Sequence, residues 1–358
     1  MRTMAIINQK GGCGKTTSTI NIGACLSQKK KKVLLVDMDP QAHVSLGLGF
    51  KPGEYLGCIH DLLINSDQSN KTIEDCLLQI SPYLHVIPSD TVLSTAEPIL
   101  LQRENREYCL KEVLKSVSDN YDFIIIDCPP NIGVLTFNSL LACQEAIIPI
   151  ESGLFSMHGL SRLMDTINLV NLNCGHKIRV NALATMYDRR TRIAEETLLE
   201  TKRSFVGHVF KTVINQNVKL KEAASYGQPI VSYCKSCSGF KDYMDLTEEI
   251  LSMDGVKEKA ADRKDELKPP VLTKDGVLFT CYAPNAKSVR LVANFNEWNE
   301  EKMPLYNIEG DGIFQKVVPL KEGRYQYKFV VDGEWIMDPI NPNIEKSPFG
   351  ENSIFEIN

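Results

Sequence analysis

The chain has 358 residues, of which 43% are hydrophobic and 24% are charged, and its formal net charge is −5. This composition is typical of a soluble globular protein and excludes a collagen-like or largely disordered chain. The mild acidity gives no general support for nucleic-acid binding, so any such contact requires a local basic patch. No apolar run reaches the ~18 residues of a spanning helix, and no signal peptide precedes the first expected strand. We therefore expect a cytoplasmic protein with no membrane partner.

The first 253 residues alternate short apolar runs with longer amphipathic stretches. This alternation predicts an α/β domain with a mostly parallel sheet flanked by helices. Buried parallel strands read as continuous apolar runs, and Phe-Ile-Ile-Ile-Asp at 123–127 is one of them. The expected strands are 4–8, 32–37, 84–88, 123–127, 146–149 and 180–186, and the expected helices include 16–28, 106–116, 159–171 and 195–205.

A glycine-rich loop, Lys10-Gly11-Gly12-Cys13-Gly14-Lys15-Thr16-Thr17, separates the first expected strand from the first expected helix. Glycines let backbone N–H groups approach phosphate oxygens, and the helix that follows adds the positive end of its dipole. Lys15 is placed for the terminal phosphates, and the Thr16 hydroxyl is placed for Mg²⁺. We therefore expect Gly11 to Thr17 to contact ATP with bound Mg²⁺, with Cys13 as a tolerated small residue.

The 11 cysteines do not predict a disulfide framework. Most of them stand alone in apolar segments, as small buried side chains do in a reducing compartment. Cys234 and Cys237 form a C-x-x-C pair. A metal site at this pair stays an alternative, although a metal ion generally needs four ligands.

The character of the chain changes after residue 253. Residues 254–270 are densely charged and end in two prolines, which predicts a solvated linker. Residues 271–358 contain short alternating segments separated by turn signals such as Asp332-Gly333, which predicts an all-β, immunoglobulin-like sandwich. The expected strands there are 277–282, 288–294, 313–319, 325–331 and 353–357.

The glycine-rich loop lacks the usual first glycine, which is Gln9 here, and carries Lys10 in addition. It resembles the deviant phosphate loop, KGGxGKT[ST], of the ParA/MinD superfamily. Later segments resemble further motifs of that family in the same order. They are Leu-Leu-Val-Asp-Met-Asp-Pro-Gln at 34–41, Ile-Ile-Ile-Asp-Cys-Pro-Pro at 124–130, Thr-Met-Tyr-Asp at 185–188 and Asn-Val-Lys-Leu-Lys-Glu-Ala at 217–223. The resemblance spans roughly residues 1–250 and is to a Soj-type ParA rather than to MinD.

This resemblance implies a homodimer that forms with ATP and hydrolyses it slowly, stimulated by a ParB-like partner. Lys10 would reach across the dimer to the partner's nucleotide, whereas Lys15 would act within its own subunit. Asp39 would orient the attacking water. Phosphoryl transfer depends on such placed cations and on an oriented nucleophile.

The same resemblance implies the ligands of the metal. Asp127, with Asp37 nearby and together with Thr16, would hold Mg²⁺. Met186 belongs to a later family motif and is expected to lie beside the nucleotide. A helix cap or a solvated acid is the alternative for either carboxylate.

Members of this family bind DNA without sequence preference as ATP dimers, and two basic positions of the family fall on Arg190 and Lys219. Contacts of this kind are made to phosphates and weaken with salt. A protein that binds in this way would be associated with the nucleoid. Ordinary solvated charges remain the alternative, because the chain is acidic and Asn215-Gln216 stands where the family commonly has Pro-Arg.

The C-terminal segment resembles the glycogen-binding module of AMP-activated kinase β subunits and of isoamylases. The resemblance rests on Asn-Phe-Asn-Glu-Trp-Asn at 294–299, on residues 323–335 and on Asn-Ser at 352–353. It implies an α-glucan site formed by Trp298, Lys328, Trp335, Phe349 and Asn352. Aromatic faces stack on sugar rings, and amide and ammonium groups bind hydroxyls. No pair of acids resembles a glycosidase dyad, so we expect binding without hydrolysis.

Together these features predict a ParA-like ATPase that partitions or positions DNA or another cargo and carries a module for α-glucan. The alternative is a nucleotide-switched scaffold that tethers glycogen or a protein without partitioning DNA. A purely structural β-sandwich also remains open.

Overall fold

The computed structural model describes residues 1–64, 71–151, 156–205, 207–253, 267–273, 276–284, 286, 288–300, 302–307, 312–347 and 350–357. The chain divides into two compact units. One comprises Met1–Leu198 with Val209–Met253, and the other comprises Leu199–His208 with Asp254–Asn358. Most of the expected linker, 254–266, lies outside the described residues, as does Phe349.

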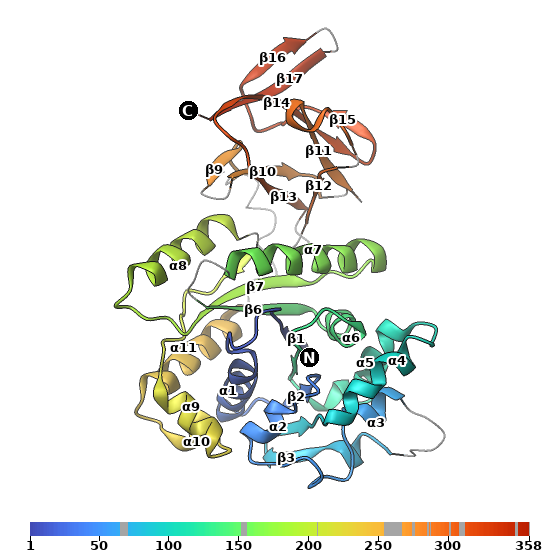
Figure 1. Ribbon diagram of the computed structural model, residues 1–358, viewed down its shortest axis with the longest axis vertical. Helices are drawn as coiled ribbons and strands as arrows, with labels where there is room; N and C mark the ends of the chain where they lie inside the picture. The colour runs from blue at the N-terminus through green and yellow to red at the C-terminus, as the bar shows by residue number, and fades with distance from the viewer. Residues whose placement is uncertain are drawn as a thin grey trace. The chain divides into compact units, whose positions relative to one another are not determined.

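An eight-stranded sheet organises the first unit, in the order β3-β4-β2-β5-β1-β6-β7-β8 (Figure 1). Neighbouring strands from β4 to β7 pair in parallel, and β3 pairs with β4 antiparallel. The α/β fold with a mostly parallel sheet is therefore confirmed. The strands are β1 (Arg2–Ile6), β2 (Val33–Asp37), β3 (Leu78–Ser81), β4 (Leu84–Ile87), β5 (Phe123–Asp127), β6 (Glu145–Glu151), β7 (Arg179–Thr185) and β8 (His208–Val209).

Helices flank this sheet on both sides (Figure 1). They are α1 (Lys15–Gln28), α2 (His43–Gly47), α3 (Ile59–Ile64), α4 (Ala96–Leu100), α5 (Cys109–Lys115), α6 (Val134–Ala142), α7 (Ser156–Cys174), α8 (Arg192–Ser204), α9 (Val218–Ser225), α10 (Ile230–Tyr233) and α11 (Ser238–Ser252). Alternate strand residues such as Met4, Leu35 and Ile125 join α1, α10 and α11 in one buried cluster. A Cβ on Gly23 would lie 2.6 Å from Leu35 Cδ2, so the glycine lets α1 approach β2 closely.

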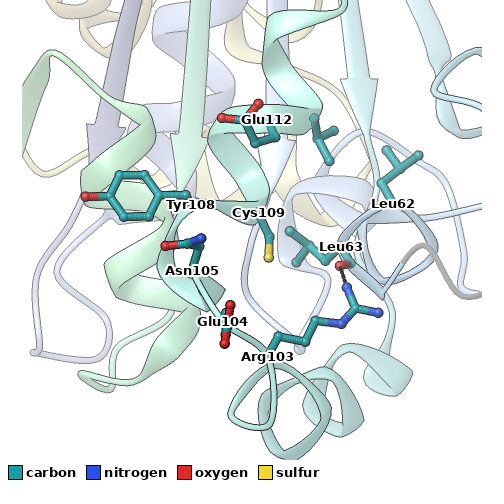
Figure 2. Close-up of a pocket in the computed structure, with 9 residues that line it drawn as sticks. Leu62, Leu63, Arg103, Glu104, Asn105, Tyr108, Cys109 and Glu112 are labelled. Carbon is teal, nitrogen blue, oxygen red and sulfur yellow. Dashed lines mark hydrogen bonds between the residues drawn. The ribbon is translucent and has the colours of Figure 1, made fainter.

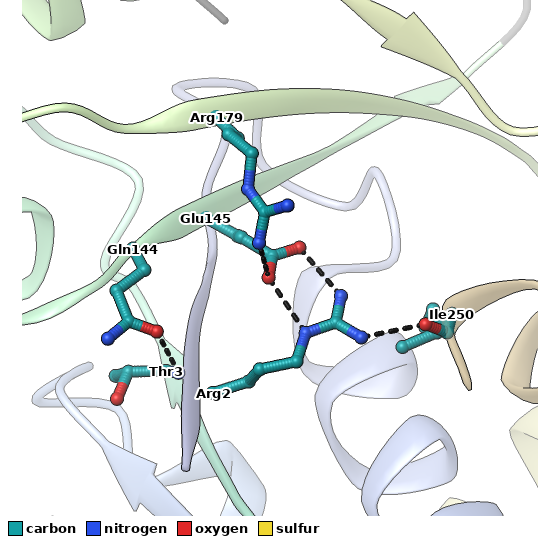
Figure 3. A network of polar contacts seen from close by, with 6 residues as sticks. All are labelled: Arg2, Thr3, Gln144, Glu145, Arg179 and Ile250. Atoms are coloured by element: carbon teal, nitrogen blue, oxygen red, sulfur yellow. Dashed lines mark hydrogen bonds and ion pairs between the residues drawn. The ribbon is translucent and has the colours of Figure 1, made fainter. Parts of the chain in front are cut away.

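A buried ion network ties the amino-terminal ends of three strands together (Figure 3). Glu145, at the start of β6, has a side chain that is only 1% exposed. Its carboxylate accepts two hydrogen bonds from Arg2, at 2.8 and 2.9 Å, and one from Arg179, at 2.6 Å. Arg2 also donates to the carbonyl of Ile250 at 2.7 Å, in the last turns of α11. The network therefore fastens the end of α11 to the sheet.

The second unit contains two antiparallel sheets, β13-β10-β9 and β12-β11-β14-β17-β16, with β15 paired to β14. Residues from both sheets meet in one buried cluster, in which the Phe279 and Tyr327 rings lie 5.0 Å apart edge to face. The expected sandwich is therefore confirmed. The strands are β9 (Val271–Thr273), β10 (Gly276–Tyr282), β11 (Val289–Ala293), β12 (Pro304–Leu305), β13 (Ile313–Val318), β14 (Gly323–Val331), β15 (Glu334–Ile336), β16 (Ile344–Ser347) and β17 (Gly350–Ile357).

A polar group sits inside this sandwich core. The Tyr327 hydroxyl donates to Asp338 Oδ2 at 2.7 Å and accepts from Asn341 Nδ2 at 2.8 Å. Burial raises the pKa of Asp338, and the carboxyl is held by this bond and by the Ile340 N–H at 3.0 Å. The network satisfies polar atoms that would otherwise destabilise the core.

Candidate active site

The carboxyl ends of parallel strands meet at one edge of the first sheet, and the predicted nucleotide residues gather there. The glycine-rich loop follows β1, Asp37 ends β2 and Asp127 ends β5. Asp37 and Asp127 are direct partners in the strand register. Glu151 and Thr185, which end β6 and β7, are paired in the same way. Ligands of open α/β sheets bind at the carboxyl ends of the strands, at the point where the strand order reverses.

The loop after β1 has the backbone of a phosphate cradle. Gly12 and Gly14 have φ of 74° and 91°, in the left-handed region that favours glycine. A Cβ built on Gly11 or Gly12 would meet nothing within 4 Å, so these two positions face open space. Thr185 donates to the Cys13 carbonyl at 2.8 Å and fixes the loop from β7.

Lys15 and Met186 lie beside this loop, as the sequence predicts. The Lys15 ammonium is largely buried and donates to the Lys10 carbonyl at 3.1 Å, so it lies folded back over the loop. The Met186 Cε would be 3.9 Å from a Cβ on Gly14. In the described part of the chain, the amide nitrogen of Gln9 is buried without a hydrogen-bond partner. Such an atom next to the loop suits a polar ligand.

Behind the loop, two threonine hydroxyls hold one buried carboxylate. Thr16 donates to Asp127 Oδ2 at 2.7 Å, and Thr19 donates to Oδ1 at 2.9 Å. Burial raises the pKa of Asp127 to about 7. Burial and the charge of Asp127 both raise the pKa of Asp37, which is also fully buried. Among the described residues, neither carboxylate forms an ion pair, so the two adjacent groups fit a bound divalent ion.

The donor set suits Mg²⁺ in particular. Mg²⁺ prefers oxygen ligands and is usually held by one or two carboxylates together with substrate phosphates. Thr16, Asp127 and Asp37 supply such oxygens beside the loop. Within the described ranges, no group of three or more His, Cys, Asp or Glu side chains is arranged around a metal position. The geometry therefore fits a metal completed by phosphate oxygens.

Asp39 lies at the same edge, directly connected to Asp37. Its N–H donates to Asp37 Oδ1 at 3.1 Å, and its Oδ1 accepts from the Gln41 N–H at 3.0 Å. Asp37 Oδ2 accepts from the Val44 N–H at 3.1 Å, near the start of α2. Through these two bonds, Asp37 holds the segment that carries Asp39 close to the residues that could bind Mg²⁺.

The extra lysine of the loop has a partner that the sequence interpretation did not name. Lys10 Nζ lies 2.6 Å from Glu151 Oε2, and the two side chains are 37% and 33% exposed. The Lys10 N–H donates to Asn8 Oδ1 at 3.0 Å, and Asn8 Nδ2 donates to the Pro149 carbonyl at 2.6 Å. The sequence could have indicated Glu151 as a site residue, because it ends an apolar strand as Asp37 and Asp127 do.

A phosphate loop between a parallel strand and a helix, with a threonine and an aspartate paired behind it, defines a P-loop ATPase. Residues 1–180 match the AAA domain family. Soj, the chromosome-partitioning ATPase of Treponema pallidum, is 42% identical over 257 residues, covering 71% of this chain and 98% of Soj. The sporulation initiation inhibitor protein Soj of Bacillus subtilis is 40% identical over 250 residues, covering 70% and 98%. The chain belongs to the ParA/Soj family of ATPases.

Two further comparisons concern the solved structures and the C-terminal unit. Cobyrinic acid a,c-diamide synthase from Mycobacterium smegmatis, with bound ATP analog and magnesium, has a TM-score of 0.63 and 29% identity. The similarity covers 72% of this chain and 98% of the synthase. Residues 266–344 match carbohydrate-binding module 48, the isoamylase N-terminal domain. Among the described helices, none has both the length and the apolar character needed to cross a bilayer.

In the second unit, the predicted sugar residues within the described ranges share one sheet face. Lys328 and Val330 alternate with the buried Tyr327 and Phe329 on β14, and Trp335 pairs with Val330 from β15. Continuing the β14–β17 register beyond its Tyr327–Ser353 pair sets Asn352 opposite Lys328.

The two tryptophans form the aromatic part of this face. The Trp298 and Trp335 rings are stacked, with centroids 6.2 Å apart and an angle of 24°. Trp335 is 43% exposed, and its Nε1 donates to Glu300 at 2.8 Å. Asn352 is buried and donates to Gln326 Oε1 at 2.9 Å, so its amide is already engaged within the sheet.

The two basic positions of the first unit are exposed but paired. Arg190 is 85% exposed at its side chain and forms an ion pair with Asp188 at 2.8 Å. Lys219, near the start of α9, is 49% exposed and lies 2.7 Å from Glu222. A phosphate group that bound here would compete with these acids.

A separate hollow of about 780 Å³ lies between α3 and α5 (Figure 2). Arg103, which lines it, donates to the Leu63 carbonyl at 3.1 Å and also to Ile64 O. The arginine therefore satisfies the last carbonyls of α3. None of the predicted site residues lines this hollow.

The two threonines on Asp127 allow a matched test of the metal position. We expect Thr16→Ala to weaken Mg²⁺-dependent ATP binding by roughly tenfold, because the variant lacks the hydroxyl oxygen proposed to hold the metal. Thr19→Ala removes a similar bond from the fully buried side of the same carboxylate and should leave binding nearly unchanged. Titration of a fluorescent ATP analogue, with Mg²⁺ and with EDTA, measures both variants. Equal losses in the two would contradict a metal position at Thr16.

Proposed function

We propose that this protein is an ATP-switched dimer that hydrolyses ATP to ADP and phosphate and positions a cargo on DNA. Its C-terminal module would bind an α-glucan. The convergence of Lys15, Thr16, Asp127 and Asp37 at the carboxyl edge of the sheet supports the ATPase part most directly. The proposed domains are 1–253 for the ATPase, 254–270 for the linker and 271–358 for the module.

Each residue at the nucleotide edge has a proposed task. Bound Mg²⁺ supplies charge neutralisation to the phosphates. Lys15 leaves the Lys10 carbonyl to pair with phosphate oxygens, and Thr16 and Asp127 hold the cation. Asp39 orients the attacking water, and its position is set by its N–H bond to Asp37.

Lys10 supports the dimer in this proposal. Its ammonium lies at the exposed side of the loop and is held by Glu151 rather than buried over its own loop as Lys15 is. A third of each side chain remains exposed, so the ion pair exchanges partners at small cost. The phosphates on a second subunit offer more negative charge than one carboxylate. ATP binding and dimer formation thereby become one event.

The dimer is tested by changing the two lysines separately. We expect Lys10→Ala to bind ATP but to stay monomeric, since it loses only the cation that reaches the other subunit. Lys15→Ala is the comparison and should lose ATP binding itself. Light scattering after size-exclusion chromatography measures mass with and without ATP. A Lys10→Ala protein that dimerises as wild type does would contradict the proposal.

The proposed DNA surface includes α9 and the turn after β7. Arg190 and Lys219 are exposed cations there, and Val218 and Tyr226 beside Lys219 are 68% and 70% exposed. Their acid partners, Asp188 and Glu222, are partly exposed and are readily displaced. Contacts of this kind bind phosphates irrespective of sequence, and they would place the protein on the nucleoid. A ParB-like partner would then set the lifetime of the ATP state.

The DNA surface is tested with the double variant Arg190→Ala plus Lys219→Ala. We expect it to weaken ATP-dependent DNA binding by roughly tenfold or more and to flatten the salt dependence, because phosphate contacts are lost. Lys115→Ala is the control, since Lys115 is also exposed and forms an i,i+3 ion pair with Glu112. Electrophoretic mobility at several salt concentrations provides the measurement. If wild type with ATP binds no DNA at low salt, the alternative scaffold without DNA partitioning is favoured.

The sugar surface is tested through the exposed tryptophan. We expect Trp335→Ala to weaken glycogen binding by roughly tenfold, because the stacked aromatic face is lost. Lys321→Ala, in the exposed turn before β14, is the control. Co-sedimentation with glycogen measures binding directly. Both tryptophans of the chain lie in this module, so tryptophan fluorescence reports on this module alone. Equal pelleting of wild type and Trp335→Ala would leave the sandwich a structural module.

A further inference from the structure

Cys234 and Cys237 flank the short turn that joins α10 to α11. Cys234 follows the last residue of α10, and Cys237 is the N-cap of α11. Cys237 Sγ donates to the Cys234 carbonyl at 3.2 Å. Both residues are partly exposed, whereas seven of the described cysteines are buried. The Cys237 thiol therefore lies against the backbone of Cys234 at an accessible place.

The surroundings shift the pKa values of the two thiols in opposite directions. Hydrogen bonds from Ser236 and from Cys237 lower the pKa of Cys234, and its sulfur lies 3.8 Å from Ser236 Oγ. Burial raises the pKa of Cys237. The positive end of α11, a helix of 15 residues, faces the turn. A more acidic, accessible thiol beside a protonated one is the arrangement used in thiol–disulfide exchange.

The turn is also joined to α9 on both of its sides. Before the pair, the Tyr233 hydroxyl donates to Glu222 Oε2 at 2.8 Å, and Glu222 holds Lys219. After the pair, Ser238 Oγ accepts from Asn217 Nδ2 at 2.7 Å, and Asn217 is the N-cap of α9. A change in the conformation of this turn would therefore disturb the bonds to the N-cap of α9 and to Glu222 on its exposed face.

Within the described part of one subunit, the two thiols lack the further ligands of a metal site. Across the residues that the structure describes, no third Cys, His, Asp or Glu is arranged with these thiols to hold a metal. A structural zinc site has four such ligands.

We propose that Cys234 and Cys237 form a reversible intramolecular disulfide, and that its closure alters the α9 surface. The oxidant is a small-molecule disulfide such as glutathione disulfide. The Cys234 thiolate attacks one of its sulfurs, which forms a mixed disulfide and releases one glutathione thiolate. Cys237 then loses its proton, and its sulfur attacks Cys234 Sγ, which closes the ring and releases the second glutathione. Two cysteines are oxidised, and one glutathione disulfide is reduced to two glutathiones.

Closure is measured on the full-length protein in buffers of reduced and oxidised glutathione. We expect loss of alkylation at Cys234 and Cys237 together, with loss of the mass of two hydrogens from their peptide, and full recovery in excess reduced glutathione. Cys237→Ser should instead keep one glutathione on Cys234. Cys174→Ser is the control, because Cys174 is an exposed single cysteine. If both thiols stay open to alkylation in excess glutathione disulfide, the proposal is wrong.

The effect on α9 is measured by hydrogen exchange, independently of any DNA binding. Oxidation of wild type should change exchange of the Val218–Ser225 amides, and the same treatment of the double variant Cys234→Ser plus Cys237→Ser should not. Unchanged exchange in a fully closed wild type would overturn the link to α9. A change in DNA affinity on closure rests on the proposed function. Absence of DNA binding in both redox states would refute that function and leave the disulfide assay standing.

Discussion

The structure depends on two carboxylates buried side by side at the ends of neighbouring strands. Asp37 and Asp127 have no exposed surface, and the pKa of each is raised by burial. Burying such groups is costly unless they are hydrogen bonded or paired with a cation. Thr16 and Thr19 partly meet this need for Asp127, and backbone N–H groups meet it for Asp37. These hydrogen bonds offset part of the cost of burying the two carboxylates.

The same hydrogen bonds connect the two carboxylates to neighbouring segments at this edge of the sheet. Asp37 connects to the backbone of Asp39 and to Val44 at the start of α2. Thr16 lies in the first turn of α1, which follows the phosphate loop directly. A change in charge at this edge therefore alters the hydrogen bonds that hold the loop, the segment around Asp39 and α2. On the other side of the loop, Lys10 is held in place by its ion pair with Glu151.

The sequence was sufficient to predict most of the first unit, and the reasons are local. Buried parallel strands are continuous apolar runs, so β2 and β5 were predicted within a residue of their ends. The short strands β3 and β8 were missed, since Leu78–Ser81 is half polar and His208–Val209 has only two residues. In the second unit, β9, β12, β15 and β16 were missed because two to four residues carry too little periodicity.

The site could be predicted where a motif carries it, and not where tertiary contacts create it. The loop follows from glycine spacing, and Asp37 and Asp127 follow from segments that resemble the family's motifs. Thr19 reaches Asp127 only because α1 packs against β5, and Thr185 reaches Cys13 only because the end of β7 lies beside the loop. The stacking of Trp298 on Trp335 joins a turn to β15, which lies far from it in sequence. The acid partners of Arg190 and Lys219 lie close in sequence, but their bonds require the actual turns.

The network around Glu145 has a mechanical consequence. The first unit's chain leaves through α11, and the Ile250 carbonyl in its last turns is held by Arg2. Arg2, Glu145 and Arg179 stand at the starts of β1, β6 and β7, at the opposite edge of the sheet from the phosphate loop. The end of α11 is therefore anchored through Arg2 to the starts of three strands, at the edge of the sheet opposite the phosphate loop.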